Sequence, residues 1–210
     1  MRTPVQDPYI LRQAIGAHLG QVLTPDVAAG ILAEALAAPD LSIDPLQFGM
    51  LFKGGLLFRA ERMRDVLAEL HPLHQAHWLE TEKHRHGLPL APDYDAMLAD
   101  ERAGRLVQFT ARDERHELVG NLRMYLGVSR HSGTKFATED TLYLAPKARG
   151  GFTALALMRF AERALLSIGV REIRADSKLV NNAGALMRRM GYEPVATQYV
   201  KIFKESSHVC

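Results

Sequence analysis

The chain has 210 residues, of which 47% are hydrophobic and 24% charged, an ordinary balance for one well-buried globular domain. It contains no run of about 18 apolar residues, no apolar signal segment after Met1 and a single cysteine, Cys210, so we expect a cytoplasmic protein with neither a membrane span nor an internal disulfide. The net charge of +2 conceals a basic stretch at 145–190, with nine basic residues against three acidic ones. Such a stretch suits binding of an anionic ligand or of nucleic acid, or it is simply a surface exposed to solvent.

Residues 1–50 are predicted to form a helical extension in front of a main domain at 51–210. Two short helices are expected within 8–38, the second of them beginning at Thr24-Pro25-Asp26, and 39–55 is interpreted as a connector with scattered Pro and Gly. Because short Ala-rich helices rarely stand alone, this extension should pack on the main domain or on another subunit, for example in a homodimer.

The middle of the chain begins with a predicted strand at 56–60. Apolar residues at roughly helical spacing predict a helix at 62–79, interrupted by Pro72, and a second helix at 93–103 starts after a proline with Asp93 at its N-cap.

The clearest pattern is period-2 alternation over 105–111 and 118–128, with a polar turn between them. It predicts an antiparallel hairpin with one buried face, followed by another strand at 138–145.

After this strand, the apolar residues recur at helical spacing. The apolar stripe of 153–168 predicts a helix that ends before a glycine, followed by a strand at 170–177, a helix at 182–190 and a last strand at 197–203. Hairpins followed by alternating strands and helices predict a mixed α/β sheet.

The turn between the strand at 138–145 and the helix at 153–168 is the strongest candidate for a binding site. A helix N-terminus presents unpaired N–H groups and partial positive charge to a pyrophosphate. Gly150 and Gly151 allow close backbone approach, and Lys147 and Arg149 add charge. The alternative is a plain helix start with incidental glycines.

This turn resembles motif A of the GNAT acetyltransferases, in which the pattern R/Q-x-x-G-x-G/A opens a helix after a strand. Arg149 and Ala154 match that pattern, whereas Phe152 stands where the fourth-position glycine is usual. The stretch from 181 to Gly191-Tyr192 resembles motif B. The resemblance covers about 56–204. Within the family, the sequence is similar in particular to GNAT proteins encoded by phages and prophages.

The resemblance implies the GNAT acyl-CoA N-acyltransferase fold, a mixed, mostly antiparallel sheet flanked by helices, with acetyl-CoA as co-substrate. It also implies that the strand before the turn pairs with the pantetheine arm while the turn holds the phosphates. The implied cofactor contacts are Leu142, Tyr143, Leu144, Lys147, Arg149, Gly150, Gly151, Phe152, Thr153, Ala154, Ser177 and Asn182.

The resemblance also implies direct attack of an amine on the thioester, which requires a base and an acid. Glu139 and Asp140 are the candidate bases, Glu139 being favoured, and strand alternation places them on opposite faces. The acid of many relatives, a tyrosine, is replaced here by Met187, so either Tyr192, Tyr143 or water protonates the thiolate, or the thiolate leaves without assistance.

Three histidines, His71, His74 and His77, recur at intervals of three on the helix predicted at 62–79. They could bind zinc, but Pro72 disrupts their register and no cysteine lies near. The resemblance instead places His77, Trp78 and Glu80 in the wall of an amine pocket, and a helix with exposed histidines is the remaining interpretation.

The resemblance therefore implies an acetyl-CoA-dependent N-acetyltransferase that modifies an amine-bearing small molecule or protein. Two alternatives stay open: a non-catalytic GNAT-fold module that binds acyl-CoA or a partner, and a phage-type enzyme acting on nucleic acid or a host protein.

Overall fold

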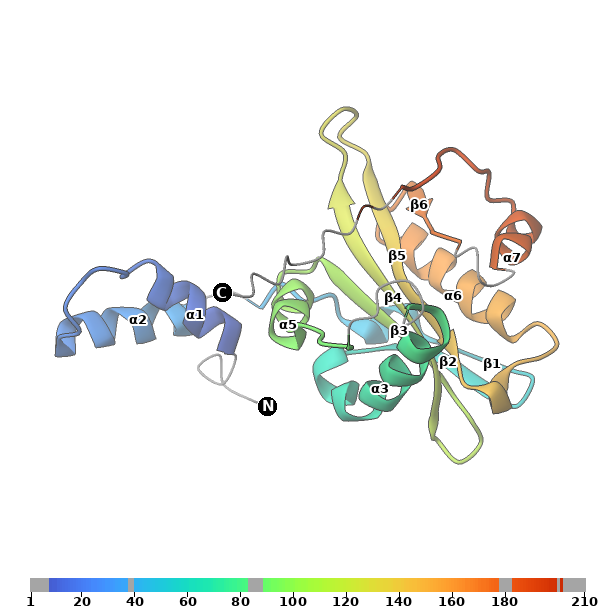
Figure 1. The fold of residues 1–210 in the computed structure, drawn as a ribbon, viewed down its shortest axis with the longest axis horizontal. Coiled ribbons are helices and arrows are strands. Elements are labelled where there is room, and N and C mark those ends of the chain that lie inside the picture. The colour runs from blue at the N-terminus through green and yellow to red at the C-terminus, as the bar shows by residue number, and fades with distance from the viewer. Residues whose placement is uncertain (1–7, 38–39, 83–88, 178–182, 200, 202–210) are drawn as a thin grey trace, which may run out of the picture.

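The computed structural model describes residues 8–37, 40–82, 89–177, 183–199 and 201. Within these ranges, six strands form one sheet in the order β1-β2-β3-β4-β5-β6, and helices cover both of its faces (Figure 1). Neighbouring strands from β1 to β5 are antiparallel, whereas β6 is parallel to β5. The mixed, mostly antiparallel sheet predicted from the sequence is confirmed.

The elements have the following bounds. The strands are β1 Met50–Lys53, β2 Leu56–Glu61, β3 Leu106–Arg112, β4 Leu118–Val128, β5 Lys135–Leu144 and β6 Glu172–Arg174. The α-helices are α1 Pro8–Gly16, α2 Pro25–Ala37, α3 Met63–His77, α5 Tyr94–Arg102, α6 Thr153–Ser167 and α7 Ala183–Met190. Short helical turns are η2 Pro45–Phe48, the π-helix η3 Trp78–Glu82, and η4 Pro146–Ala148.

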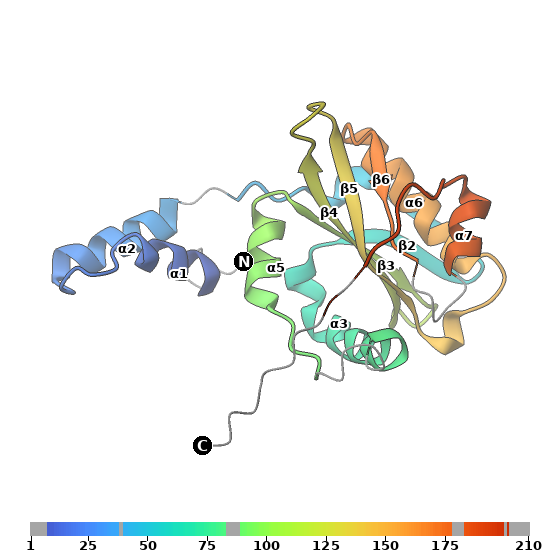
Figure 2. The same ribbon diagram turned by 45° about the horizontal axis from the view of Figure 1, so that its top comes forward.

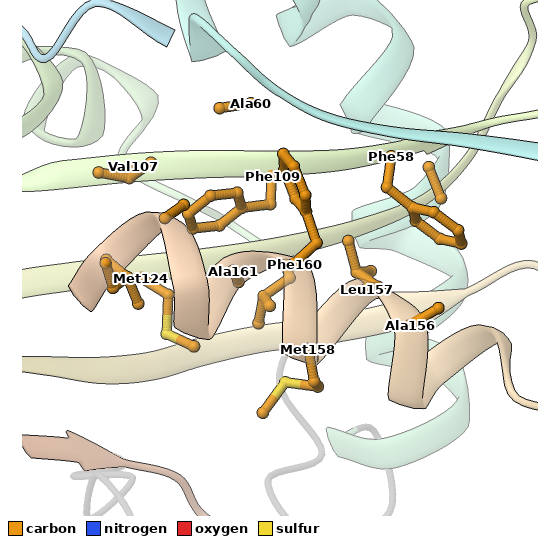
Figure 3. Packing of buried hydrophobic residues seen from close by; sticks show 14 of the residues in the cluster. Phe58, Ala60, Val107, Phe109, Met124, Ala156, Leu157, Met158, Phe160 and Ala161 are labelled. Carbon is orange, nitrogen blue, oxygen red and sulfur yellow. The ribbon is translucent and has the colours of Figure 1, made fainter. Parts of the chain in front are cut away.

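Helix α6 packs on one face of the sheet and forms the main hydrophobic core. Leu157, Phe160 and Leu165 are buried against residues of β2, β3 and β4. Figure 3 shows Phe160 of α6 pointing toward Phe109 of β3, and their rings meet edge to face with centroids 6.0 Å apart. This packing fixes α6, and therefore the turn that precedes it, relative to the sheet.

The opposite face of the sheet is covered by α3 and α5. Met63, Val66 and Leu70 of α3 pack against Leu106 of β3 in a separate hydrophobic cluster. The buried Arg112 of β3 also donates to carboxylates of β2 and α3, namely Glu61 and Glu69, at 2.8 Å each. These contacts fix α3 above the sheet.

Helices α1 and α2 pack on each other through Ala14, Ile31 and Ala35. In Figures 1 and 2 this pair lies to one side of the sheet, next to α5, to which it is joined by an ion pair between Arg12 and Asp95. No helix within the described ranges is long and apolar enough to cross a membrane.

The prediction that 39–55 form a connector is wrong at the C-terminal end of that segment, because 50–53 form strand β1. The cause is the Gly54-Gly55 turn, in which both glycines have positive φ (63° and 75°) and Lys53 pairs with Leu56. A two-residue loop of this kind is the type I′ turn that closes a β-hairpin.

Three other predicted elements differ from the structure. Pro72 does not interrupt α3, which continues to His77. The strand predicted at 170–177 shortens to β6, and 197–199 lie in no strand, the rest of that prediction falling mostly outside the described residues. Val195 and Tyr199 are 91% and 90% exposed, so this segment buries no face that could stabilise a strand.

Candidate active site

Strands β5 and β6 separate along their length. Residues 136–138 of β5 pair with 172–174 of β6, but β5 continues to Leu144 without a described strand on that side. The separation leaves backbone N–H and C=O groups of 139–144 along an open edge, which can pair with an extended ligand.

A β-bulge lies where this separation begins. Arg123 of β4 pairs with Thr141, and the next residue, Met124, pairs with Glu139, so Asp140 is the extra residue. Glu139 therefore shares the α6 face with Met124, whereas Asp140 bonds to Arg123 on the α3 face. The two carboxylates point to opposite faces, as strand alternation predicted, and bulges often occur beside active sites.

The turn before α6 has the backbone expected of a phosphate-binding loop. Gly150 and Gly151 have φ values of 131° and 52°, and a Cβ at either position would meet nothing within 4 Å. Glycine is therefore required by backbone conformation and not by lack of space. Phe152 is the N-cap of α6 and makes no side-chain capping bond. The N–H of Thr153 donates to the Gly150 carbonyl at 3.2 Å, which leaves the N–H groups of Ala154 and Leu155 in the first turn for an anion.

One cavity of about 350 Å³ joins the turn to the open edge of β5. Its volume lies within the range of small-molecule sites. The lining residues that the sequence predicted are Leu142, Tyr143, Leu144, Arg149, Gly150, Gly151, Phe152, Ala154, His77 and Glu80. The lining residues that it missed are Thr81, Leu155, Leu186 and Arg189.

Several predicted contacts do not line this cavity. The ammonium group of Lys147 instead bonds to Asp113 at 3.1 Å and to Glu117 at 2.5 Å. Thr153 donates its hydroxyl to the Gly150 carbonyl at 3.1 Å and so stabilises the turn. Ser177 and Trp78 are absent from the lining, and Asn182 lies outside the described residues.

Arg149 lines the cavity and is held in place by hydrogen bonds. Its Nε donates to the Leu144 carbonyl at 2.8 Å, and its two terminal nitrogens donate to Glu80 at 2.9 and 2.6 Å. Its guanidinium carbon lies 5.3 Å from the centre of the Tyr143 ring. These hydrogen bonds hold the pKa of Glu80 below its ordinary value, so the carboxylate is ionised at neutral pH.

Phe152 occupies the position where the motif usually has glycine. Its side chain is 54% exposed, with the Arg189 guanidinium 4.8 Å from the ring centre. The ring therefore lies outside the turn and leaves the backbone there accessible. Arg189 belongs to the basic stretch at 145–190, but its position over Phe152 depends on how α7 packs.

The three histidines of α3 have different neighbours. The ring of His71 lies 6.2 Å from that of Tyr94, and the ring of His77 lies 5.6 Å from that of Tyr143. His74 is buried, with Nδ1 3.0 Å from the Tyr94 hydroxyl and Nε2 3.4 Å from Arg123. Among the described residues, no group of three or more His, Cys, Asp or Glu is placed to hold a metal ion.

Tyr192 lies beyond α7 and packs against the α6 core, outside the cavity. Burial raises the pKa of its hydroxyl, and the negative charges of Glu162 and Glu139 raise it further. The phenol is therefore protonated at neutral pH. Met187, which the resemblance places where many relatives have a tyrosine, is buried, and a thioether cannot donate a proton.

No protein-family model and no curated protein matches the chain. Solved acetyltransferase structures do match it. One is an aminoglycoside acetyltransferase, meta-AAC0020, from an uncultured soil metagenomic sample, in complex with sisomicin (TM-score 0.54, 18% identity, 72% of this chain and 96% of that one). Another is a ribosomal-protein-alanine N-acetyltransferase from Brucella melitensis biovar Abortus 2308 (TM-score 0.56, 18% identity, 71% and 99%).

A third match is AAC(6')-Iy in complex with the bisubstrate analog CoA-S-monomethyl-acetylneamine (TM-score 0.53, 19% identity, 72% and 98%). The chain spans nearly the whole length of each of these proteins. Together they show that the fold is that of the GNAT acetyltransferases.

Proposed function

We propose that the protein is an acetyl-CoA-dependent N-acetyltransferase whose acceptor is an amine-bearing small molecule or protein. One observation carries this proposal: a single cavity joins the uncapped N-terminus of α6, two glycines of positive φ and the open edge of β5. The acetyltransferase fold supports it.

The lining of the cavity suits the pyrophosphate and the pantetheine arm of acetyl-CoA. The N–H groups of Ala154 and Leu155 in the first turn of α6, together with Arg149, suit the pyrophosphate. The open edge of β5 at 142–144 suits the amide groups of pantetheine, which can pair like a short strand. Leu142, Leu155 and Leu186 supply apolar contacts for its carbon chain.

Acetyl-CoA supplies the activated acyl group. The acceptor nitrogen forms a bond to the acetyl carbonyl carbon while the C–S bond breaks and the thiolate leaves. The nitrogen loses a proton and the thiolate gains one, so the protein needs a proton acceptor and a proton donor.

Asp140 is the carboxylate that the geometry favours as proton acceptor. It lies at the bulge where the open edge begins and on the same face as Tyr143 and His77, and its side chain is 41% exposed. Arg123 holds it with bonds of 2.8 and 2.6 Å, which fixes its direction. Glu139 faces α6 and, with Tyr192, lies on the other side of the sheet.

A non-catalytic acyl-CoA-binding module is the second candidate. It is favoured by the observation that Glu139, Asp140 and Tyr192, the three predicted catalytic residues, are all absent from the cavity lining.

Calorimetry and a thiol assay separate these functions. Acetyl-CoA should bind the wild-type protein and bind Gly151→Asp at least about tenfold more weakly, since the new carboxylate opposes the phosphates. Gly133→Asp is a matched control, because Gly133 also has positive φ (68°) and open space but lies in the β4–β5 turn. Release of CoA with pooled amines supports the enzyme, binding without release supports the module, and the absence of binding contradicts both.

A further inference from the structure

Glu80 and Arg149, which both line the cavity, form an ion pair. The two side chains meet fork to fork. They are 47% and 40% exposed, so water and solutes reach the pair. The pair joins two segments far apart in the sequence, the π-helix η3 and the turn before α6.

We propose that the Glu80 carboxylate occupies the place beside Arg149 that a phosphate of acyl-CoA takes, so that Glu80 and the cofactor compete for one guanidinium. This inference rests on the proposed function. A carboxylate and a phosphate both present two oxygens at a spacing that matches the arginine fork. The turn that carries Arg149 also holds the exposed helix N–H groups, so an anion bound there reaches both.

The competition links the cofactor to the opposite wall of the cavity. Glu80 lies on η3 between His77 and Thr81, which line the same cavity. When phosphate takes Arg149, η3 loses its bond to the turn, and the wall formed by these residues can move. π-Helices are rare and are frequently found at functional sites. Binding of the cofactor should therefore release η3 from the turn on the side of the cavity that faces α3.

The decisive measurement is calorimetric titration of CoA into wild-type protein, Glu80→Gln and Glu117→Gln. Glu80→Gln keeps the size of the side chain but removes its charge, and CoA should bind it about three- to fivefold more tightly, the modest factor expected for an exposed ion pair. Glu117→Gln is the control, because Glu117 forms a similarly exposed pair with Lys147 outside the cavity. CoA should bind this variant as tightly as it binds the wild-type protein.

A double-mutant cycle tests whether the gain acts through Arg149. In an Arg149→Ala background, Glu80→Gln should no longer tighten CoA binding, because the guanidinium for which the two anions compete is gone. Equal gains in both backgrounds, or an equal gain in Glu117→Gln, would mean a general charge effect and would overturn the proposal. Unchanged or weaker binding of CoA to Glu80→Gln overturns it as well. If the wild-type protein does not bind CoA, the proposed function itself fails.

Trp78, the only tryptophan of the chain, reports on η3 directly, because it is the first residue of that helix. Adding CoA to the wild-type protein should shift its fluorescence emission, and ligand-free Glu80→Gln should already show part of that shift. If CoA binds with no change in Trp78 emission in either protein, η3 does not move and the displacement is contradicted. Thermal unfolding of each variant checks that it is folded.

Discussion

At the scale of single residues, Arg123 connects α3 to the bulge of β5. Its guanidinium donates to Asp140 and to Thr141, and a terminal nitrogen lies 3.4 Å from Nε2 of His74. Because arginine can only donate, Nε2 must accept this bond, so the proton of the neutral ring is on Nδ1 and points to Tyr94. This chain of bonds fixes Asp140 in the direction that the proposed reaction needs.

His74 gives this network a pH dependence. Burial, and then the charge of Arg123, lower its pKa from 6.5 to about 4, while Asp140 opposes the shift and His77 and His71 add to it. As the pH falls below 6.5, the unfolded chain takes up this proton before the folded protein does. The stability that neutral His74 provides is therefore complete above pH 6.5 and is lost between pH 6.5 and 4.

We therefore expect His74→Gln to show a shallower fall in the free energy of unfolding over that range, by up to about 1.4 kcal/mol per pH unit. Urea denaturation at several pH values measures this slope. His71→Gln is the control, because His71 lies one turn away on the same helix, is exposed and is the smallest of the contributors to the pKa of His74, so this variant should change the slope much less. Parallel curves for His74→Gln and wild type would rule out the buried neutral histidine.

Asp140 carries the proposed proton transfer. Asp140→Asn keeps the shape of the side chain but removes its basicity, so kcat should fall by about 10²-fold or more once an acceptor is found, the usual contribution of a general base. Binding of acetyl-CoA should change little. Glu139→Gln, on the opposite face, should lower kcat much less. The reverse order of these two effects would assign the base to Glu139.

At the scale of elements, the position of the turn depends on how firmly α6 packs. Phe160→Ala removes a ring that meets Phe109 in the core and should reduce the free energy of unfolding by about 3–5 kcal/mol. Leu166→Ala on the same helix is the control, since Leu166 is exposed and should change stability little. Chemical denaturation compares the two, and a small effect of Phe160→Ala would show that α6 is not held by this core.

The elements also show what the sequence could and could not predict. Alternation at 118–128 and the stripe at 153–168 predicted β4 and α6, because the apolar face of each packs on the same core. The single buried face predicted for the hairpin is wrong, because α3 and α5 cover its other face and bury Asn121 and Arg123 as well. Local patterns could not show that Asp140 is the extra residue of a bulge, which depends on pairing with β4. Nor could local patterns show that Glu80 pairs with Arg149, which lies 69 positions away in the chain.

At the scale of the whole molecule, the basic stretch at 145–190 is partly neutralised. Lys147 pairs with Asp113 and Glu117, Arg149 with Glu80, and Arg174 with Glu172. A surface that binds nucleic acid through phosphates needs cations free to contact them. These pairings favour a small anion at one site over a long polyanion across the surface.

The N-terminal residues divide into two sets by their contacts. Helices α1 and α2 bury only a few residues, chiefly against each other, and the Arg12–Asp95 pair is mostly exposed. In contrast, the segment after α2 joins the main core. The rings of Phe48 and Phe109 lie 6.1 Å apart, and the backbone N–H of Leu41 donates to the Arg102 carbonyl at 2.8 Å.

A variant lacking 1–39 should therefore unfold at nearly the same urea concentration as the full chain, because exposed ion pairs contribute little. A variant lacking 1–49 should lose about 2–4 kcal/mol, since it gives up the half-buried Phe48 and Ile43 and the Leu41 hydrogen bond. Phe48→Ala in the full chain separates the packing of this ring from the deletion. If both deletions are equally harmful, α1 and α2 themselves stabilise the sheet. If neither is, the main domain begins near 50, as the sequence predicts.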